Sequence, residues 1–333
     1  MYLLNDLEHH VFEIPYQNGY RKIRILSGYA SSAFLTHILT RYPKIEIDLI
    51  VGMAIKDGIR RWDHEQYTQI STENSRITIS YQMEYPAIHT KVYYWYDEHL
   101  RTSTAFIGSS NFSWNGFRDQ NELLGEVNYS NIEEVFNISQ TINCNDPNVE
   151  DRINFYNLKT RRAKTETGTQ ELQLDMEIIN ENSEETERLT NLEYVDLSLL
   201  LANDTEIHER SGLNWGQREG REPNQAYIPV PTPFNRENPE FFPPLEESFT
   251  MLTDDEQQLV CKMAQQNRKA IHTTENNSIM GRYFRERLGV PLGERVDVQD
   301  VLNYGRTSVR VYKIDSATYF MDFGTDPYVT EVW

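Results

Sequence analysis

The sequence predicts two unlike domains: an N-terminal α/β domain whose mixed sheet is flanked by helices, and a mostly-β, barrel-like C-terminal domain. Strand-like and helix-like patterns alternate early in the chain and lead into a strand-rich middle, which is typical of such a sheet. Short strands with few helices follow residue 194, which is typical of a barrel. The composition changes between 145 and 191, and a length of 333 residues also favours about two domains.

Hydrophobic patterns place the individual elements. In the N-terminal half the expected strands are 23–28, 45–54 and 76–81, then three strands that carry polar motifs, and the expected helices are 30–40, 57–71 and 133–141. In the C-terminal half the expected strands are 195–201, 227–230, 249–252, 270–271, 309–314 and 318–323, with a short helix at 298–304. The predicted domains are therefore 1–165 and 192–333, joined by an acidic linker at 166–191 that can be partly helical or stranded.

Polar residues follow or open the three motif strands. His89 and Lys91 are two positions apart, so on a strand they share a face. An apolar run ends at Gly108, where Ser109 and Asn111 follow in a tight turn, and Glu122 opens the next apolar run.

These residue types together suit a phosphodiester. An imidazole serves as nucleophile or general acid/base. Lys91 and Asn111 can neutralise charge on the non-bridging oxygens, and Glu122 can hold the imidazole tautomer of His89. The sequence shows no cluster of carboxylates for magnesium, so we expect no metal and no cofactor. Each motif alone is usually structural, and the hypothesis depends on their conjunction.

Composition narrows the class of protein. The net charge of −19 argues against a generally basic nucleic-acid coat but leaves room for a local basic face. The two cysteines form no disulfide framework or zinc set, and the N-terminus lacks a signal-peptide pattern. We therefore expect a soluble, cytoplasmic protein without membrane contacts.

Two polar stretches of the C-terminal half, 210–225 and 269–287, are candidate DNA-reading arms. Arg reads guanine edges and Asn or Gln reads adenine edges, while Ser, Thr and Lys hold phosphates. The alternative is an Asx-rich loop and an amphipathic helix that are merely solvated. The candidate DNA contacts are Asn214, Trp215, Gln217, Arg218, Arg221, Asn224, Lys269, Asn276, Asn277, Ser278, Arg282 and Arg285.

The motifs resemble a known superfamily. His89-x-Lys91 followed by Gly108-Ser-Ser-Asn111 is similar to the phospholipase D signature, whose enzymes form a covalent phosphohistidine, and Glu122 matches a Glu found after it. The family's Asp five positions after the Lys is here Tyr96, which resembles the nuclease branch.

The C-terminal half resembles the DNA-binding domains of phospholipase D-type restriction endonucleases of the NgoFVII-like family, with BfiI more distant. The resemblance rests on 211–218 and 276–285 and implies a pseudobarrel similar to the plant B-three domain, which clamps the major groove of double-stranded DNA.

The resemblance also implies partners. The family site needs two half-sites and this chain has one, so two chains would pair as a homodimer. Lys91, Ser109 and Asn111 would hold the phosphate. Some relatives work with an ATP-dependent translocase-like protein, and a restriction enzyme also implies a cognate DNA methyltransferase. This chain has no phosphate-binding Gly-x-x-x-x-Gly-Lys-Ser/Thr loop of its own.

The predicted function is therefore type II-like, sequence-specific DNA cleavage in a restriction-modification setting. The alternatives are a non-specific phospholipase D-type nuclease or lipid phosphodiesterase, a DNA-binding regulator whose first half only dimerises, and a DNA-binding subunit active only with an ATP-dependent partner.

Overall fold

The chain divides into two compact units, which are described separately. One consists of Met1–Asn157 with Met176–Thr186, and the other of Leu158–Asp175 with Glu187–Trp333. The computed structural model describes residues 2–97, 102–119, 121–127, 131–138, 140–164, 170–180, 183–189, 192–201, 206–245, 247–255 and 257–325.

The first unit is built on a mixed sheet, as the sequence predicts. Its strand order in the described chain is β1-β8-β7-β6-β2-β3-β5-β9. The central strands β2, β3 and β5 are parallel, and their neighbours on either side are antiparallel. The strands are β1 (Tyr2–Leu3), β2 (Lys22–Ser27), β3 (Glu46–Val51), β5 (Ile77–Gln82), β6 (Lys91–Asp97), β7 (Thr102–Gly108), β8 (Leu124–Val127) and β9 (Thr141–Asn143).

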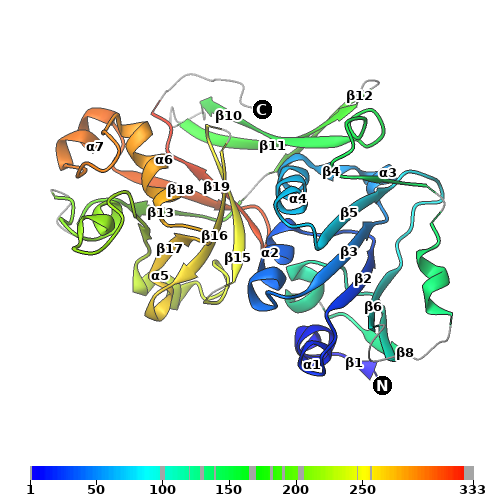
Figure 1. The fold of residues 1–333 in the computed structure, drawn as a ribbon. Coiled ribbons are helices and arrows are strands. Elements are labelled where there is room, and N and C mark those ends of the chain that lie inside the picture. Colours follow the sequence, from blue (N-terminus) through cyan, green and yellow to red (C-terminus); the bar gives the residue numbers. More distant parts are fainter. Residues whose placement is uncertain are drawn as a thin grey trace. The chain divides into compact units, whose positions relative to one another are not determined.

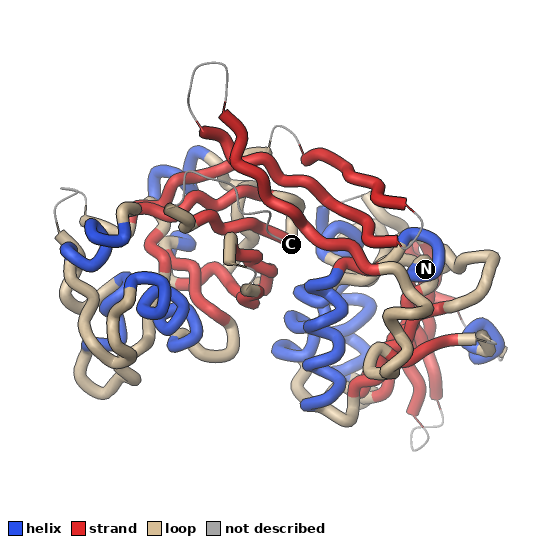
Figure 2. The backbone as a smooth tube through the Cα atoms, turned by 90° about the horizontal axis from the view of Figure 1, so that it is seen from above, coloured by secondary structure: helices blue, strands red, loops and turns tan. Residues whose placement is uncertain are grey.

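Both faces of this sheet are buried. On one face Tyr93 and Trp95 of β6 pack against Phe12, with ring centroids 6.0 and 6.1 Å away. On the other face Tyr94 packs against Ile132 and Phe136. Because successive strand residues point to opposite faces, the middle of β6 is buried on both sides, from Val92 to Trp95. Figures 1 and 2 show helices α2 and α4 beside the sheet.

The two longer helices of this unit begin and end close to the expected places. The short helices in the described chain are η1 (His9–Glu13), α1 (Ile14–Gln17), α3 (Ala54–Asp57), η2 (Asn115–Asp119) and η3 (Ile132–Phe136), and the longer ones are α2 (Ser32–Arg41) and α4 (Arg61–Glu73). The buried carboxylate of Asp63 on α4 accepts from the backbone N–H of Ser32 at 2.8 Å, so α4 caps the first turn of α2.

One expectation for the first half needs correction. The helix predicted at 133–141 is only the single 3₁₀ turn η3, followed by β9, because Ile132 and Phe136 are its buried anchors and the three residues between them are exposed. The segment 166–191, predicted as a linker that can be partly stranded, contributes strands. In the described chain β10 (Phe155–Lys164), β11 (Gln170–Asn180) and β12 (Ser183–Leu189) follow one another in a sheet with β4 (Ile59–Arg60).

The second unit contains a strongly bent sheet, whose strand order is β13-β18-β19-β15-β16-β17-β14 among the described residues. The two end strands approach each other, which nearly closes a barrel. The strands are β13 (Tyr194–Ser198), β14 (Ile228–Pro229), β15 (Ser248–Thr253), β16 (Gln258–Ala264), β17 (Ala270–Thr273), β18 (Ser308–Lys313) and β19 (Thr318–Asp322).

Helices and turns complete the second unit: η4 (Gly212–Gln217), α5 (Thr232–Glu237), η5 (Gln266–Arg268), α6 (Ser278–Leu288) and α7 (Val298–Tyr304). Helix α7 has the predicted bounds and begins with a capping box between Asp297 and Asp300. Strand β16 was not predicted; in it the buried Leu259, Cys261 and Met263 alternate with half-buried residues, one of them the apolar Val260. No helix within the described ranges is long and apolar enough to cross a membrane.

His64 of α4 gives the first unit an acid-sensitive point. Its ring is 7% exposed, hydrogen-bonds the Tyr81 hydroxyl at 2.9 Å and packs on Phe155 at 4.3 Å. Burial, with a smaller effect of Arg61, lowers the pKa of His64 to about 4. The folded pKa lies below the ordinary value, so the unfolded chain takes up the proton first as the pH falls.

We therefore expect His64 to lower the stability of the first unit progressively between about pH 6.5 and pH 4. In His64→Gln the amide can still bond Tyr81, so the melting temperature should fall less steeply over this range than in the wild type. Thermal melts followed by circular dichroism measure this. His10→Gln is the control and should keep the wild-type slope; equal slopes for wild type and His64→Gln would contradict the prediction.

Candidate active site and DNA-binding surface

Four chain segments of the first unit meet at one edge of the sheet. Strand β6 begins with Lys91, which pairs with Gly108 at the end of β7, and Gly108 pairs with Leu124 at the start of β8. On the other side β6 pairs antiparallel with β2, which places the segment before Lys91 beside Gly28 at the end of β2. The sheet order therefore brings the three motifs to the same edge.

His89 and Lys91 are joined directly. The Lys91 ammonium donates to Nε2 of His89 at 2.9 Å. Because an ammonium can only donate, Nε2 of His89 must accept, and it is therefore the ring nitrogen that carries the lone pair. His89 itself lies just before β6 and is exposed, whereas Lys91 is only 3% exposed.

Burial lowers the pKa of Lys91, because desolvation disfavours its charged form, and the nearby Glu122 carboxylate acts in the opposite direction.

Glu122 and Ser109 form the other polar pair. The Ser109 hydroxyl donates to the Glu122 carboxylate and accepts from the Leu123 backbone N–H at 3.1 Å. Gly108 permits this arrangement, since a Cβ there would lie 1.9 Å from the Leu123 carbonyl oxygen.

Glu122 was expected to orient His89. In the described structure its hydrogen bond goes to Ser109 instead, and its charge acts on Lys91, so the expected role changes.

Asn111 is held by the segment after β2. Its Oδ1 accepts from the backbone N–H of Tyr29 at 3.1 Å, which fixes the carboxamide with its NH₂ group as the remaining donor. Tyr29 also packs edge-on against His89, with ring centroids 5.7 Å apart. All five predicted residues, His89, Lys91, Ser109, Asn111 and Glu122, therefore belong to one connected cluster.

The sequence analysis missed Gly28, Tyr29 and Asp57. The available signal was the glycine at the end of the predicted strand 23–28, which repeats the pattern of Gly108 after its strand. What could not be read from the sequence is that the β2 end lies beside β6.

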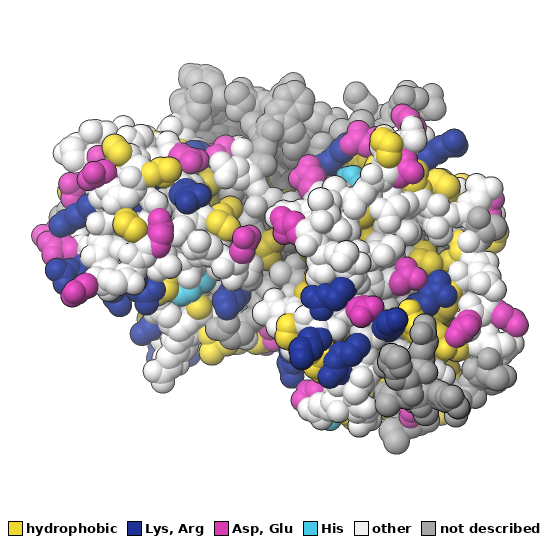
Figure 3. All heavy atoms as spheres, viewed as in Figure 1, with side chains coloured by type: hydrophobic (Ala, Val, Ile, Leu, Met, Phe, Trp, Pro, Cys, Tyr) yellow, Lys and Arg dark blue, Asp and Glu magenta, His cyan; other side chains and the backbone are white. Residues whose placement is uncertain are grey.

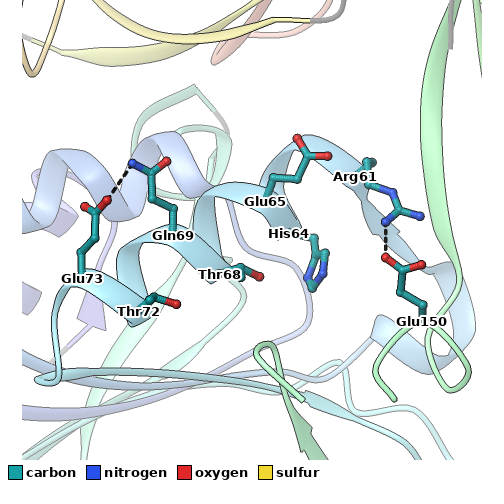
Figure 4. Close-up of a pocket in the computed structure, with 8 residues that line it drawn as sticks. All are labelled: Arg61, His64, Glu65, Thr68, Gln69, Thr72, Glu73 and Glu150. Atoms are coloured by element: carbon teal, nitrogen blue, oxygen red, sulfur yellow. Dashed lines mark hydrogen bonds and ion pairs between the residues drawn. The ribbon is translucent and has the colours of Figure 1, made fainter. Parts of the chain in front are cut away.

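A separate pocket of about 440 Å³ lies along α4 (Figure 4). Its lining includes three carboxylates, Glu65, Glu73 and Glu150, against one guanidinium, Arg61, which is already paired with Glu150 at 2.6 Å. Burial raises the pKa of Glu65, with Arg61 opposing it. This lining does not suit a phosphodiester. Within the described ranges no group of three or more His, Cys, Asp or Glu side chains could hold a metal ion.

The two candidate DNA-reading stretches of the second unit pack against each other. Glu222 accepts from the Ser278 hydroxyl and from Asn224 Nδ2, and the backbone N–H of Ala226 donates to the Asn277 carbonyl at 3.1 Å. They were expected to be two arms that straddle a groove. Instead, α6 and the loop 212–226 form one body.

Several predicted DNA contacts are structural in this body. Arg285 is fully buried and donates to backbone carbonyls. These hydrogen bonds are strong because the surroundings have a low dielectric constant. Burial lowers its pKa, with Glu222 opposing. The carbonyls belong to Glu294, Gly281, Asn224, Leu213 and Pro223.

The same holds for three amides. Asn214 bonds both backbone groups of Val296, at 2.7 and 2.9 Å. Asn224 accepts from Gly293 at 2.6 Å, and Gln217 donates to Pro223 and Gly293 carbonyls at 3.1 Å each. These residues, with buried Ser278, are removed from the candidate contacts, because their polar groups already have internal partners.

Exposed candidates remain: Arg218, Arg221, Lys269, Asn276 and Arg282, with the half-buried Trp215 and Asn277 beside them. The Arg221 guanidinium lies 3.8 Å over the Trp215 ring and donates to Gln225 at 3.0 Å. Figure 3 shows that basic side chains also gather on part of the other unit, so the negative net charge coexists with local positive surface.

Family comparison agrees with both halves. The model of the NgoFVII restriction endonuclease N-terminal PLD (phospholipase D) domain matches residues 5–151, and that of the NgoFVII C-terminal B3-like DNA-binding domain matches residues 187–315. The chain is thus of the restriction endonuclease class, with a PLD domain followed by a DNA-binding domain. It belongs to the NgoFVII restriction endonuclease family, which confirms the resemblance drawn from the motifs.

Two solved structures resemble parts of the chain. A polyphosphate kinase from Porphyromonas gingivalis is 14% identical with a TM-score of 0.29, and the match covers 41% of this chain and 20% of the kinase, so the chain spans about a fifth of the kinase's length. A hypothetical Arabidopsis thaliana protein is 11% identical with a TM-score of 0.20, covering 40% of this chain and 89% of that one. No curated protein sequence matches the chain significantly.

Gly28 provides a test of the site geometry. A Cβ at this position would lie 2.8 Å from Cδ2 of His89 and 3.4 Å from Oδ1 of Asn111. We expect Gly28→Ala to displace the exposed imidazole and to lower DNA cleavage about 100-fold, since small misplacements cost this much. Stability should change little, because the imidazole can move into solvent.

Quantitative cleavage and thermal melts measure both effects. Gly125→Ala on β8 is the matched control, since its Cβ would meet nothing nearer than 3.7 Å. If Gly28→Ala cleaved DNA as fast as the wild type, cleavage would not depend on this position of the imidazole.

Proposed function

We propose that this protein is a site-specific deoxyribonuclease that hydrolyses DNA phosphodiesters without a metal, through a phosphohistidine at a site shared by two chains. The observation that carries the proposal is the hydrogen bond from Lys91 to Nε2 of His89. It presents an imidazole nitrogen with its lone pair beside an ammonium that can neutralise phosphate charge.

In the proposed first step, the Lys91 ammonium turns from Nε2 of His89 to a non-bridging oxygen of the bound DNA. The released lone pair of Nε2 then attacks phosphorus in line with the leaving oxygen. The P–N bond forms as the P–O bond breaks, and the His89 imidazolium of the second chain gives its proton to the leaving oxygen. Lys91, Ser109 and Asn111 hold the non-bridging oxygens. Their support is the geometry of the cluster, in which the Asn111 oxygen bonds Tyr29 and its NH₂ group has no hydrogen bond among the described residues.

In the second step water attacks phosphorus and breaks the P–N bond. The now neutral second imidazole takes the water's proton, which restores both histidines. Glu122 acts on its neighbours: it accepts from Ser109 and opposes the effect of burial on the charge of Lys91.

A homodimer follows from the need for a second imidazole, since the chain carries a single His-x-Lys set with its Gly-Ser-Ser-Asn motif. A two-fold axis through the site would supply it. One shared site cuts one strand at a time, so double-strand cleavage needs sequential turnovers.

The proposed biological setting rests on the family to which the chain belongs. A restriction nuclease requires a methyltransferase of the same specificity to protect host DNA, and we place the activity in the cytoplasm, where foreign DNA arrives. Dependence on ATP would have to come from a translocase-like partner, because the sequence has no phosphate-binding loop of the Gly-x-x-x-x-Gly-Lys type.

Incubating the purified protein with plasmid DNA in excess EDTA tests the function. We expect discrete fragments, no cleavage by His89→Ala at equal DNA binding, and an acid-labile DNA adduct on His89 in the wild type. A strict magnesium requirement would contradict the mechanism. A smear would favour the non-specific nuclease, and binding without cleavage would favour a DNA-binding subunit or regulator.

Arg221 tests the recognition surface. Its guanidinium is held in place by Trp215 and Gln225, so it is preorganised for a base edge. We expect Arg221→Lys, which loses the planar fork, to weaken binding to the target site about 10- to 100-fold. Binding to unrelated DNA should change little.

Competition binding at fixed salt measures the two affinities. Arg236→Lys is the control, an exposed arginine of α5 outside both candidate stretches, and should bind like the wild type. An equal loss on target and unrelated DNA would make Arg221 a phosphate contact.

A further inference from the structure

Tyr29 lies beside the proposed nucleophile. It follows Gly28 at the end of β2, is 41% exposed, and its ring meets the His89 imidazole edge-on at 5.7 Å with an interplanar angle of 75°. Edge-to-face contacts at this separation are attractive and depend on ring orientation. The Tyr29 ring can therefore restrict how the imidazole turns.

Tyr29 is itself fixed at three points. Its backbone N–H donates to Asn111 at 3.1 Å, its carbonyl accepts from the Ser27 hydroxyl at 2.6 Å, and its hydroxyl donates to the Asp57 carboxylate at 2.5 Å. Ser27 also accepts from the backbone N–H of Phe112 at 2.9 Å. The loop after β2 is thus tied to the loop that carries Asn111.

Asp57 anchors the far end of the Tyr29 side chain. It is the last residue of α3, which follows β3, whereas His89 lies just before β6. The two residues therefore belong to different segments of the chain. Burial, followed by the hydrogen bond to Asp57, raises the pKa of Tyr29 to about 12. The hydroxyl therefore stays protonated at working pH and remains committed to Asp57 rather than serving as an acid.

His89 needs such a restraint. Its side chain is exposed, and the hydrogen bond of its ring within the described structure is the one with Lys91. That bond fixes Nε2 but leaves the ring free to tilt about it. Gly28 has no side chain and so leaves room on one side of the His89 ring, and the Tyr29 ring packs against the imidazole.

We propose that Tyr29, anchored by Asp57, is a positioning residue that holds the His89 imidazole in line for attack on phosphorus. The inference rests on the nuclease function proposed above. Tyr29 also links the nucleophile to Asn111, because its ring packs on His89 while its backbone N–H bonds the Asn111 carboxamide. One residue therefore relates the position of the attacking nitrogen to that of the group that holds the phosphate oxygen.

A double-mutant cycle tests the pair. Tyr29→Phe removes the hydroxyl that donates, and Asp57→Ala removes the carboxylate that accepts, so each variant loses this hydrogen bond. We expect each to lower the single-turnover cleavage rate at saturating DNA about 10-fold or more, without weakening DNA binding. Because both changes break the same contact, the double variant should be no slower than either single one.

A second readout does not depend on cleavage. In protein labelled with ¹³C at histidine Cε1, the His89 signal is assigned by its loss in His89→Ala. We expect Tyr29→Phe and Asp57→Ala to shift or broaden this signal, because the ring samples more orientations. Tyr16→Phe, a half-buried tyrosine at the opposite end of the sheet, is the control for both readouts and should match the wild type.

The outcomes separate the two proposals. Additive rate losses, or losses in DNA binding rather than in rate, would overturn the positioning role and make Tyr29 a DNA contact. An unchanged His89 signal in both single variants would overturn it as well. Absence of cleavage by the wild type would count against the nuclease function, and the histidine signal would still decide the role of Tyr29.

Discussion

Lys91 pairs with Gly108 across β6 and β7, and the chemistry of the first unit depends on that register. The pairing places the residues before β6 beside those after β7, so His89 lies close to the segment that carries Ser109 and Asn111. The next pairing, of Gly108 with Leu124, adds Glu122. A slip of one residue would turn these side chains to opposite faces, and the buried aromatic residues of β6 oppose such a slip because both faces of the sheet are filled.

The same strand pairing also sets the electrostatic surroundings of Lys91. Lys91 sits at the first position of a buried strand, where loss of solvent lowers its pKa, and Glu122 partly offsets this. A phosphodiester placed beside the ammonium would act in the same sense as Glu122. A chain of net charge −19 can therefore present a local anion site, since the field at short range depends on the nearest groups rather than on the total.

The second unit shows why residue type alone is a poor guide to DNA contacts. Arg285 and Asn214 have the chemistry that reads bases, but both are buried and join backbone segments that would otherwise leave carbonyls unsatisfied. Arg221 has the same chemistry and is exposed on the Trp215 ring. The difference is set by α6 packing onto the loop 212–226, where Gly281 admits the Asn224 carbonyl so closely that a Cβ would lie 1.5 Å from it.

The sequence by itself determined the α/β and barrel-like classes, most strands, helix α7, and the five residues of the His89 cluster, because hydrophobic periodicity and short motifs are local properties of the chain. It missed β16 and read η3 as a longer helix. Only the tertiary structure decided that Glu122 bonds Ser109, that Tyr29 and Asp57 join the site, and which arginines are buried. Those facts depend on which strands are neighbours in a sheet, and contacts between residues far apart in the sequence leave no periodic signal in it.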